Sequence, residues 1–126
     1  VRGVQKAPEK FYKMLAKGLS KADRTFFENP DFLARTIRRT RRSHFQGARV
    51  MMEEYLNHLR PLGEDPGKIR IPVLQWHGET DGIVSIDGAR ALAADIPNVR
   101  FRSFPELGHF MIYDLWKDFL TELLDL

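Results

Sequence analysis

The feature that most constrains the fold is a change of hydrophobic period in the middle of the chain. Two prolines and two glycines within residues 61–67 interrupt any regular element. Beyond them, two short expected strands, Ile71 to Trp76 and Val99 to Phe104, flank an amphipathic helix from Ile86 to Ile96. A strongly apolar helix is expected from Ile112 to Leu123. The order strand, helix, strand, helix predicts an α/β fold, with parallel strands and a right-handed crossover.

Four helices are expected before that boundary, because apolar residues recur there every three or four positions. Proline suits a first helical turn, and serine suits the residue that caps a helix. Ser20-Lys21-Ala22-Asp23 resembles such a cap. The expected helices run from about Pro8 toward Leu19, from Ser20 to Phe27, from Pro30 or Asp31 toward a run of arginines, and from about Gln46 to His58.

The two strands after the boundary are too few to form a stable sheet by themselves. Purely parallel sheets have several strands and are covered on both faces. The run from Ile71 to Trp76 is apolar except for Gln75, which suits a strand buried on both faces. We therefore expect this segment to be the last edge of a larger parallel sheet, completed by an N-terminal half or by a second copy of the chain.

Length and composition limit the class of protein. The chain has 126 residues, 43% of them hydrophobic, so it forms one domain at most or part of a larger one. It has no membrane-length apolar run, no signal pattern and no cysteine, which excludes disulfides and thiolate zinc sites. We expect a soluble, cytoplasmic protein with no cofactor and no membrane association. The start at Val1-Arg2, without methionine, indicates a trimmed, cleaved or partial chain.

The net charge of +3 is unevenly distributed, because five arginines fall between Arg35 and Arg42. Clustered arginine neutralises phosphates, which would suit nucleic acid or an anionic membrane. Arginine also favours helices, and its aliphatic stem covers apolar surface. Aromatic residues are scarce in this run, so we favour a solvated helix face and expect no nucleic-acid partner.

Asp81 and His109 are the candidate catalytic residues. Each follows an expected strand and a glycine, Gly78 for Asp81 and Gly108 for His109. Functional groups in open α/β sheets gather beyond the carboxyl ends of the strands, so the two side chains are expected to meet. A carboxylate that accepts the imidazole Nδ1–H fixes the tautomer and leaves Nε2 free to take a proton from a nucleophile. The alternatives are a turn-forming aspartate and a buried, hydrogen-bonded histidine.

Other polar and aromatic residues support weaker hypotheses. Glu79 is an alternate acid, and Asp87 suits the first turn of the helix that follows it. His77 is expected to be structural, and His44 and His58 lack the spacing of metal ligands. A set of phenylalanines before the boundary either lines a hydrophobic pocket or holds helices together: Phe26, Phe27, Phe32 and Phe45.

Four segments after the boundary form one recognisable pattern: Ile71 to Asp81, Ala89 to Ala93, Pro97 to Val99 and Pro105 to His109. Together they resemble the C-terminal end of an α/β-hydrolase. The resemblance implies that residues 68–126 are the C-terminal βαβα part of the hydrolase core. It implies that residues 1–62 are the helical cap segment, and that Asp81 and His109 are the acid and the base of the catalytic triad.

The nucleophile of such a triad is missing from the pattern. An α/β-hydrolase carries it on a G-x-S-x-G elbow that follows a buried strand. The closest string begins at Gly18 and has helical, charged flanks, so Ser20 is expected to cap a helix. Ser43, Ser85 and Ser103 have no elbow glycines. We therefore expect this chain to be inactive in isolation.

Two functions are compatible with these features. In the first, the full-length protein hydrolyses an ester or related acyl bond of a small-molecule substrate by a nucleophile–acid–histidine triad. An aspartate nucleophile would instead imply the dehalogenase or epoxide hydrolase chemistry of the same family. In the second, the chain is a non-catalytic α/β-hydrolase-like module that pairs with another chain through its exposed sheet edge.

Overall fold

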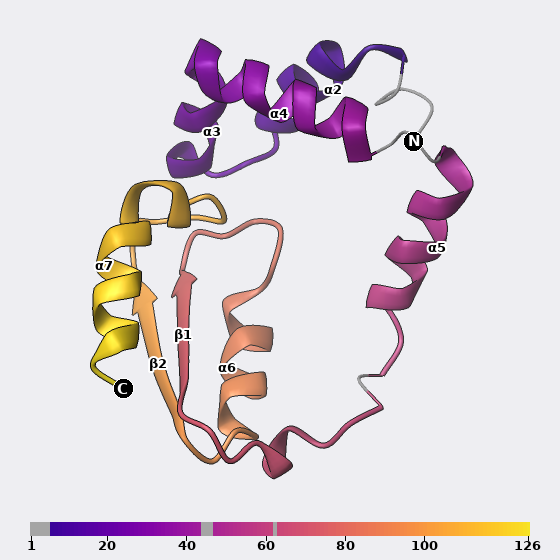
Figure 1. The fold of residues 1–126 in the computed structure, drawn as a ribbon. Helices are drawn as coiled ribbons and strands as arrows, with labels where there is room; N and C mark the ends of the chain where they lie inside the picture. Colours follow the sequence, from indigo (N-terminus) through magenta and orange to yellow (C-terminus); the bar gives the residue numbers. More distant parts are fainter. Residues whose placement is uncertain (1–5, 44–46, 62) are drawn as a thin grey trace. The chain divides into compact units, whose positions relative to one another are not determined.

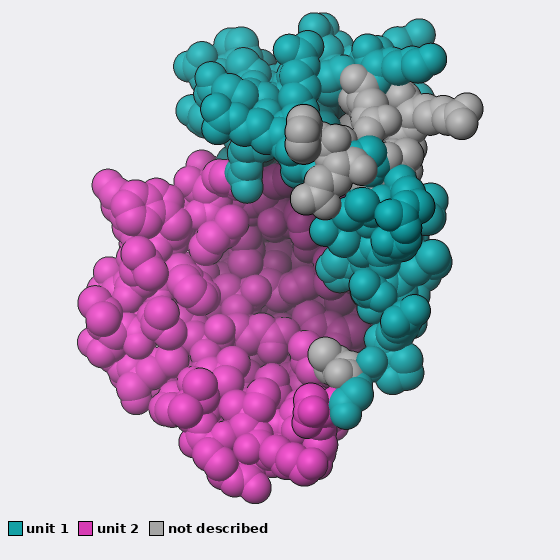
Figure 2. Space-filling view, turned by 45° about the vertical axis from the view of Figure 1, so that its right-hand side comes forward, with its two compact units in different colours: residues 1–18, 24–63 teal, residues 19–23, 64–126 magenta. Residues whose placement is uncertain are grey.

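The computed structural model describes residues 6–43, 47–61 and 63–126. The chain divides into two compact units, coloured separately in Figure 2: residues 1–18 with 24–63, and residues 19–23 with 64–126. The change of unit after Gly63 falls in the segment rich in proline and glycine. Residues 19–23 are the exception, because they cluster with the second half of the chain although they lie within the first half of the sequence.

The first unit is helical, as the spacing of its apolar residues predicts. Its helices are α2 (Pro8–Ala16), α3 (Lys21–Glu28), α4 (Pro30–Ser43) and α5 (Ala48–His58), labelled in Figure 1. The first three residues of α3 belong to the second unit. Helix α2 ends before Leu19, which is buried but lies outside the helix. The expected start of the last helix at Gln46 lies outside the described residues.

Aromatic side chains connect α2, α3 and α4 in the first unit. Phe27 and Phe32 are buried, with ring centroids 5.5 Å apart. Tyr12 stacks on Phe27 at 5.8 Å, and its hydroxyl lies 2.5 Å from the hydroxyl of Thr40. Phe26 contacts Phe32 at 5.4 Å. These contacts favour the packing role for the three described phenylalanines, whereas Phe45 and His44 lie outside the described residues.

Helix α4 carries the arginine run on its exposed side. All five arginines are exposed, while Phe32 and Thr40 of the same helix are buried. Arg41 and Arg42 lie in the last turn, where positive charge complements the negative end of the helix dipole. The expectation that a helix continues through this run is confirmed.

The second unit contains a strand–helix–strand–helix sequence (Figure 1). Strand β1 (Val73–Gly78) pairs in parallel with β2 (Val99–Phe104), with Val73 opposite Val99 and Gly78 opposite Phe104. Helix α6 (Ile86–Ala94) connects the strands, and α7 (Ile112–Leu124) follows β2. A single 3₁₀ turn, η2 (Pro66–Lys68), precedes β1. The predicted parallel pairing is confirmed.

Strand β1 is shifted relative to the expected strand from Ile71 to Trp76. The first ladder bond runs from the N–H of Val73 to the carbonyl of Asn98, at 2.9 Å, so the ladder starts after Pro72. Ile71 is 71% exposed, and the strand continues to Gly78. Helix α6 also ends at Ala94, two residues before the expected end.

The two helices of this unit cover opposite faces of the strands. Adjacent residues of a strand point to opposite faces. Gln75 donates from Nε2 to the carbonyl of Ala89 in α6 at 3.1 Å, whereas the ring of Trp76 meets Phe119 of α7 at 5.3 Å. On the α6 side, Ala89 and Ala93 are buried, since small residues let a helix approach a strand closely.

The apolar side of α7 is largely exposed. Trp116 is 48% exposed, Leu120 47% and Leu123 41%. In β1, Leu74 and Gly78 are buried and the other residues are half-buried, so the expectation of a strand buried on both faces is not met. In the described part of the chain β1 pairs with β2 alone.

Among the described residues the fold is mixed α/β, with six α-helices and a two-stranded parallel sheet. The larger sheet expected from the sequence stays a prediction, as does the assignment of residues 1–62 to a cap. No described helix has both the length and the apolar character needed to cross a membrane.

Candidate functional site

The carboxyl ends of β1 and β2 lie level with each other, which places their following loops side by side. Gly78 and Phe104, the last residues of the two strands, are register partners. The loop after β1 is tied to the loop after β2 by Thr80, whose N–H and hydroxyl both donate to the carbonyl of Leu107, at 3.0 and 2.9 Å. Parallel strands thus bring Asp81 and His109 together although they are 28 residues apart.

Asp81 and His109 form a hydrogen-bonded pair. Nδ1 of His109 lies 2.9 Å from Oδ2 of Asp81, and because a carboxylate only accepts, Nδ1 carries the proton. The other carboxylate oxygen, Oδ1, accepts the N–H groups of Ile83 at 2.8 Å and Val84 at 2.9 Å. The two interpretations of Asp81 are therefore compatible, since one oxygen forms the turn and the other holds the imidazole.

The surroundings of Asp81 keep its carboxylate ionised. Its side chain is only 5% exposed, and this burial raises the pKa. The hydrogen bonds from Val84, Ile83 and His109 act in the opposite direction, and together they lower the pKa below its ordinary value. The result is an anion held at Nδ1 of His109.

His77 is a second histidine beside this aspartate. Its Nε2 lies 3.0 Å from the carbonyl of Val84 and 3.8 Å from Oδ2 of Asp81, with the side chain 11% exposed. Since a carbonyl accepts, Nε2 of His77 donates and thereby fixes the far end of the Asp81 loop. The structural role expected for His77 agrees with this bond, and its position adjoins the site.

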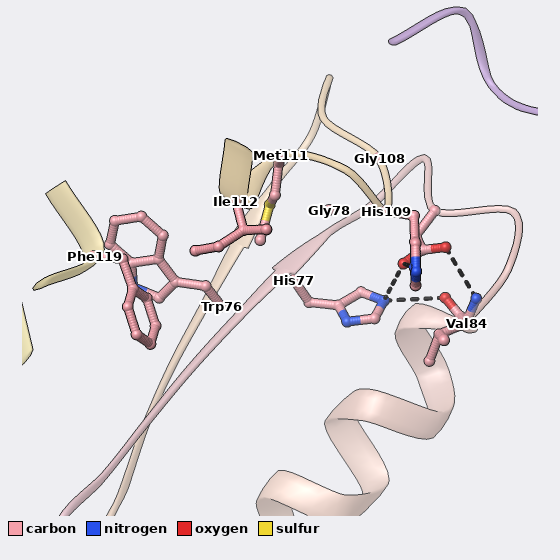
Figure 3. Close-up of a pocket in the computed structure, with 10 residues that line it drawn as sticks. Trp76, His77, Gly78, Val84, Gly108, His109, Met111, Ile112 and Phe119 are labelled. Atoms are coloured by element: carbon pink, nitrogen blue, oxygen red, sulfur yellow. Dashed lines mark hydrogen bonds and ion pairs between the residues drawn. The ribbon is translucent and has the colours of Figure 1, made fainter. Parts of the chain in front are cut away.

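A hollow of about 320 Å³ adjoins the pair. Figure 3 shows His77, His109 and Val84 at one end of this hollow and Trp76 with Phe119 at the other. The hollow is mainly apolar, and its remaining lining includes Gly78, Asp81, Gly108, Met111 and Ile112. The His109 side chain is 36% exposed, so it is not the buried histidine of the alternative interpretation. Within the described chain, Nε2 of His109 has no hydrogen-bond partner.

Gly78 and Gly108 start tight turns and also allow other groups to approach the backbone closely. Tight turns do start at both, as expected, because the carbonyl of Gly78 accepts the N–H of Asp81 at 3.1 Å and that of Gly108 accepts the N–H of Met111 at 3.4 Å. Among the described glycines only Gly47 and Gly63 have a positive φ, so these turns need no left-handed backbone. A Cβ on Gly78 would overlap the carbonyl oxygen of Leu107, and one on Gly108 would overlap the carboxylate of Asp23. Gly78 therefore lets the two loop backbones approach each other, and Gly108 lets the Asp23 side chain lie against the backbone beside His109.

The other candidate residues have separate roles. Oε1 of Glu79 accepts from Ser103 at 2.6 Å and from Arg90 at 3.4 Å, so Glu79 is not the partner of His109. Ser20 caps α3 by accepting the N–H of Asp23 at 3.2 Å, as predicted, and Ser85 caps α6 by accepting the N–H of Asp87.

No group of three or more His, Asp or Glu residues in the described ranges could hold a metal ion. His58 lies on α5 with Nδ1 2.8 Å from the carbonyl of Glu54.

Sequence reasoning missed Asp23. It treated this residue as part of a helix cap, but the side chain is fully buried in the structure and accepts the N–H of Phe110 at 2.9 Å. The two residues are 87 positions apart. No local sequence pattern predicts such a contact. The only signal in the sequence is an aspartate three residues after the capping Ser20.

Comparisons with known proteins add no assignment. No protein-family model, curated protein or solved structure gives a significant match to the chain. The resemblance to α/β-hydrolases therefore depends on the motifs and on the site geometry.

Proposed function

We propose that the chain is the C-terminal part of an α/β-hydrolase, which hydrolyses an ester or related acyl bond of a small-molecule substrate. Asp81 is its triad acid and His109 its triad base. The observation that carries the proposal is the 2.9 Å hydrogen bond from Nδ1 of His109 to an ionised Asp81, at the carboxyl ends of parallel strands.

The chemistry follows from the tautomer that Asp81 selects. With its proton on Nδ1, His109 has a basic Nε2 that can take the proton of a nucleophilic hydroxyl as that hydroxyl attacks a carbonyl carbon. The resulting imidazolium is stabilised by Asp81 and then protonates the leaving group. In the second half of the reaction, Nε2 of His109 takes a proton from water as the water attacks the acyl-enzyme. This hydrolysis releases the acid and restores the nucleophile.

We expect the nucleophile to come from a segment outside the described residues. Ser20 and Ser85 cap helices, and Ser103 donates to Glu79. Since Nε2 of His109 has no partner among the described residues, a serine or aspartate from an N-terminal half is the expected group. An aspartate would change the reaction to that of a dehalogenase or an epoxide hydrolase.

Intact mass spectrometry of the purified material with a serine-reactive fluorophosphonate tests this proposal. We expect the 14.7 kDa chain to remain unlabelled and a co-purifying polypeptide to be labelled at a rate that falls in the His109→Ala variant. An adduct on the 14.7 kDa chain would show that it carries the nucleophile itself. Labelling that is unchanged in His109→Ala would contradict the proposed role of His109.

A second candidate function is a non-catalytic module that pairs with another chain. It is favoured by the apolar side chains exposed along α7 and by a β1 strand with one partner in the described region. An unpaired strand edge is a template for association. Light scattering of the purified chain should give the mass of a dimer or a complex, and a monodisperse 14.7 kDa monomer would count against it.

A further inference from the structure

Asp23 is a buried carboxylate that the proposed triad does not use. Asp23 is 0% exposed, and burying an acidic group is costly in free energy unless its oxygens are hydrogen-bonded. Oδ1 accepts the backbone N–H of Phe110 at 2.9 Å, and Oδ2 accepts the hydroxyl of Ser20 at 3.0 Å. The Ser20 oxygen in turn accepts the N–H of Asp23 at 3.2 Å, so the carboxylate is tied to the first turn of α3.

The same carboxylate lies against Gly108. A Cβ added to Gly108 would overlap Oδ2, Cγ and Oδ1 of Asp23, which are the three nearest heavy atoms. The Asp23 side chain therefore contacts the residue before His109 and hydrogen-bonds the residue after it. The carbonyl of Gly108 also accepts the N–H of Met111, which closes the turn around His109.

We propose that Asp23 is a positioning residue that fixes the backbone on both sides of His109 so that Nδ1 meets Asp81. The inference rests on the proposed triad role of His109 and deepens it. Residues 19–23 cluster with residues 64–126 rather than with the rest of the helical region, which agrees with a dedicated support. A catalytic side chain must be held to within about 0.5 Å, so the support of its backbone affects its chemistry.

The test compares three variants of the ¹⁵N-labelled chain. Asp23→Ala removes both acceptors, whereas Asp23→Asn keeps an oxygen for Phe110 and an amide that can donate to Ser20. Asp65→Ala is the matched control, because Asp65 also accepts one backbone N–H, that of Gly67 at 2.8 Å, at an exposed 3₁₀ turn. Far-ultraviolet circular dichroism and the thermal midpoint establish that each variant is folded.

Two readouts report on His109 at about pH 8, above the ordinary pKa of histidine. The ring ¹⁵N shifts distinguish a protonated from an unprotonated nitrogen, and hydrogen exchange measures the protection of the Phe110 amide. In Asp23→Ala we expect averaged ring shifts from mixed tautomers and an exchange rate at Phe110 that is about tenfold higher or more. Asp23→Asn and Asp65→Ala should retain a single Nδ1–H tautomer.

A folded Asp23→Ala chain with the ring shifts of the wild type would overturn the proposal. If Asp23→Ala does not fold, Ser20→Ala becomes the deciding variant, because it removes only the hydroxyl that orients Oδ2. Mixed tautomers in Ser20→Ala would support the proposal, and unchanged ring shifts together with unchanged Phe110 exchange would overturn it.

These readouts separate the inference from the proposed function. They measure the contact between His109 and Asp81 and require no nucleophile or substrate. If the tautomer depends on Asp23 but fluorophosphonate labelling does not depend on His109, the support stands and the hydrolase proposal fails. If labelling depends on His109 but the tautomer is indifferent to Asp23, the hydrolase proposal stands and the support fails.

Discussion

Two segments bring an aspartate to the loop that carries His109, and they do so in different ways. The loop after β1 presents Asp81, which contacts the imidazole ring of His109. The segment 19–23 presents Asp23, which contacts the backbone at Gly108 and Phe110. One aspartate selects the tautomer of the ring, and the other holds the peptide units from which the ring projects.

The two aspartates also differ in what holds them. Asp81 is fixed by the N–H groups of Ile83 and Val84, two and three residues further along the chain. Asp23 is oriented by Ser20, but its functional contact is with Phe110, 87 residues away. The Asp81 turn is therefore a local motif with a tertiary partner, whereas the Asp23 contact exists only once distant segments have packed together.

The largest expected effect comes from Asp81 and distinguishes the two aspartates in catalysis. If the proposed hydrolase function is right, Asp81→Asn should lower kcat of the full-length protein about 10⁴-fold, because the ring adopts the wrong tautomer. Asp23→Ala should lower it about 10²-fold, the scale of a small misplacement. Turnover of a 4-nitrophenyl ester would measure both. Near-normal activity of Asp81→Asn would show that Asp81 is not the proposed triad acid. Equal losses of kcat in Asp81→Asn and Asp23→Ala would show that the two aspartates do not differ in catalysis.

The glycines test the close packing on each side of His109. Gly78→Ala and Gly108→Ala should each lower the free energy of unfolding by about 1–3 kcal/mol, since the new Cβ meets backbone at the first site and Asp23 at the second. Urea denaturation measures the change. The cost of Gly108→Ala should shrink in an Asp23→Ala background, because the colliding group is gone.

Gly88→Ala is the control for these substitutions. A Cβ there meets nothing within 4 Å, and alanine favours a helix over glycine by about 0.5–1 kcal/mol. This variant should be more stable than the wild type. If the losses in the free energy of unfolding of Gly108→Ala and Asp23→Ala simply add in the double variant, the two residues are not in contact.

The pH dependence of the free energy of unfolding should reveal the contribution of the ionised Asp81 side chain. The folded state lowers the pKa of Asp81, so its ionised form contributes stability that is complete above about pH 4, near the unfolded pKa. That contribution is lost as the pH falls through the lower folded pKa. Urea midpoints between pH 6 and pH 2 should fall less steeply for Asp81→Asn than for the wild type. Parallel curves would contradict the stabilising role of the carboxylate.

The smallest expected effect concerns Glu79, which lies in the same loop as Asp81 but faces Ser103 and Arg90. Glu79→Gln should change the free energy of unfolding by about 0–1 kcal/mol, because this ion pair is partly exposed. Activity should stay within about twofold of the wild type. A loss as large as that of Asp81→Asn would identify Glu79 as the triad acid.

Much of the fold could be predicted from the sequence. The second strand begins at Val99 and ends at Phe104, as expected, and Ser20 caps a helix as its position suggests. The expected ends of β1 were wrong, because hydrogen bonds between the two strands decide where the strand starts and stops. The bond from Val73 to Asn98 starts the ladder, so β1 begins at Val73, and Gly78 at its other end still pairs with Phe104.

The sequence by itself determined which segments are helices and strands, that the two strands are parallel, and that Asp81 and His109 follow their carboxyl ends. These properties depend on hydrophobic period and on short-range hydrogen bonds, which neighbouring residues encode. Only the tertiary structure decided that Gly78 and Gly108 serve close approach and that Asp23 lies against the His109 loop. Such contacts join residues far apart in the chain, and the space left between packed backbones has no counterpart in the local pattern.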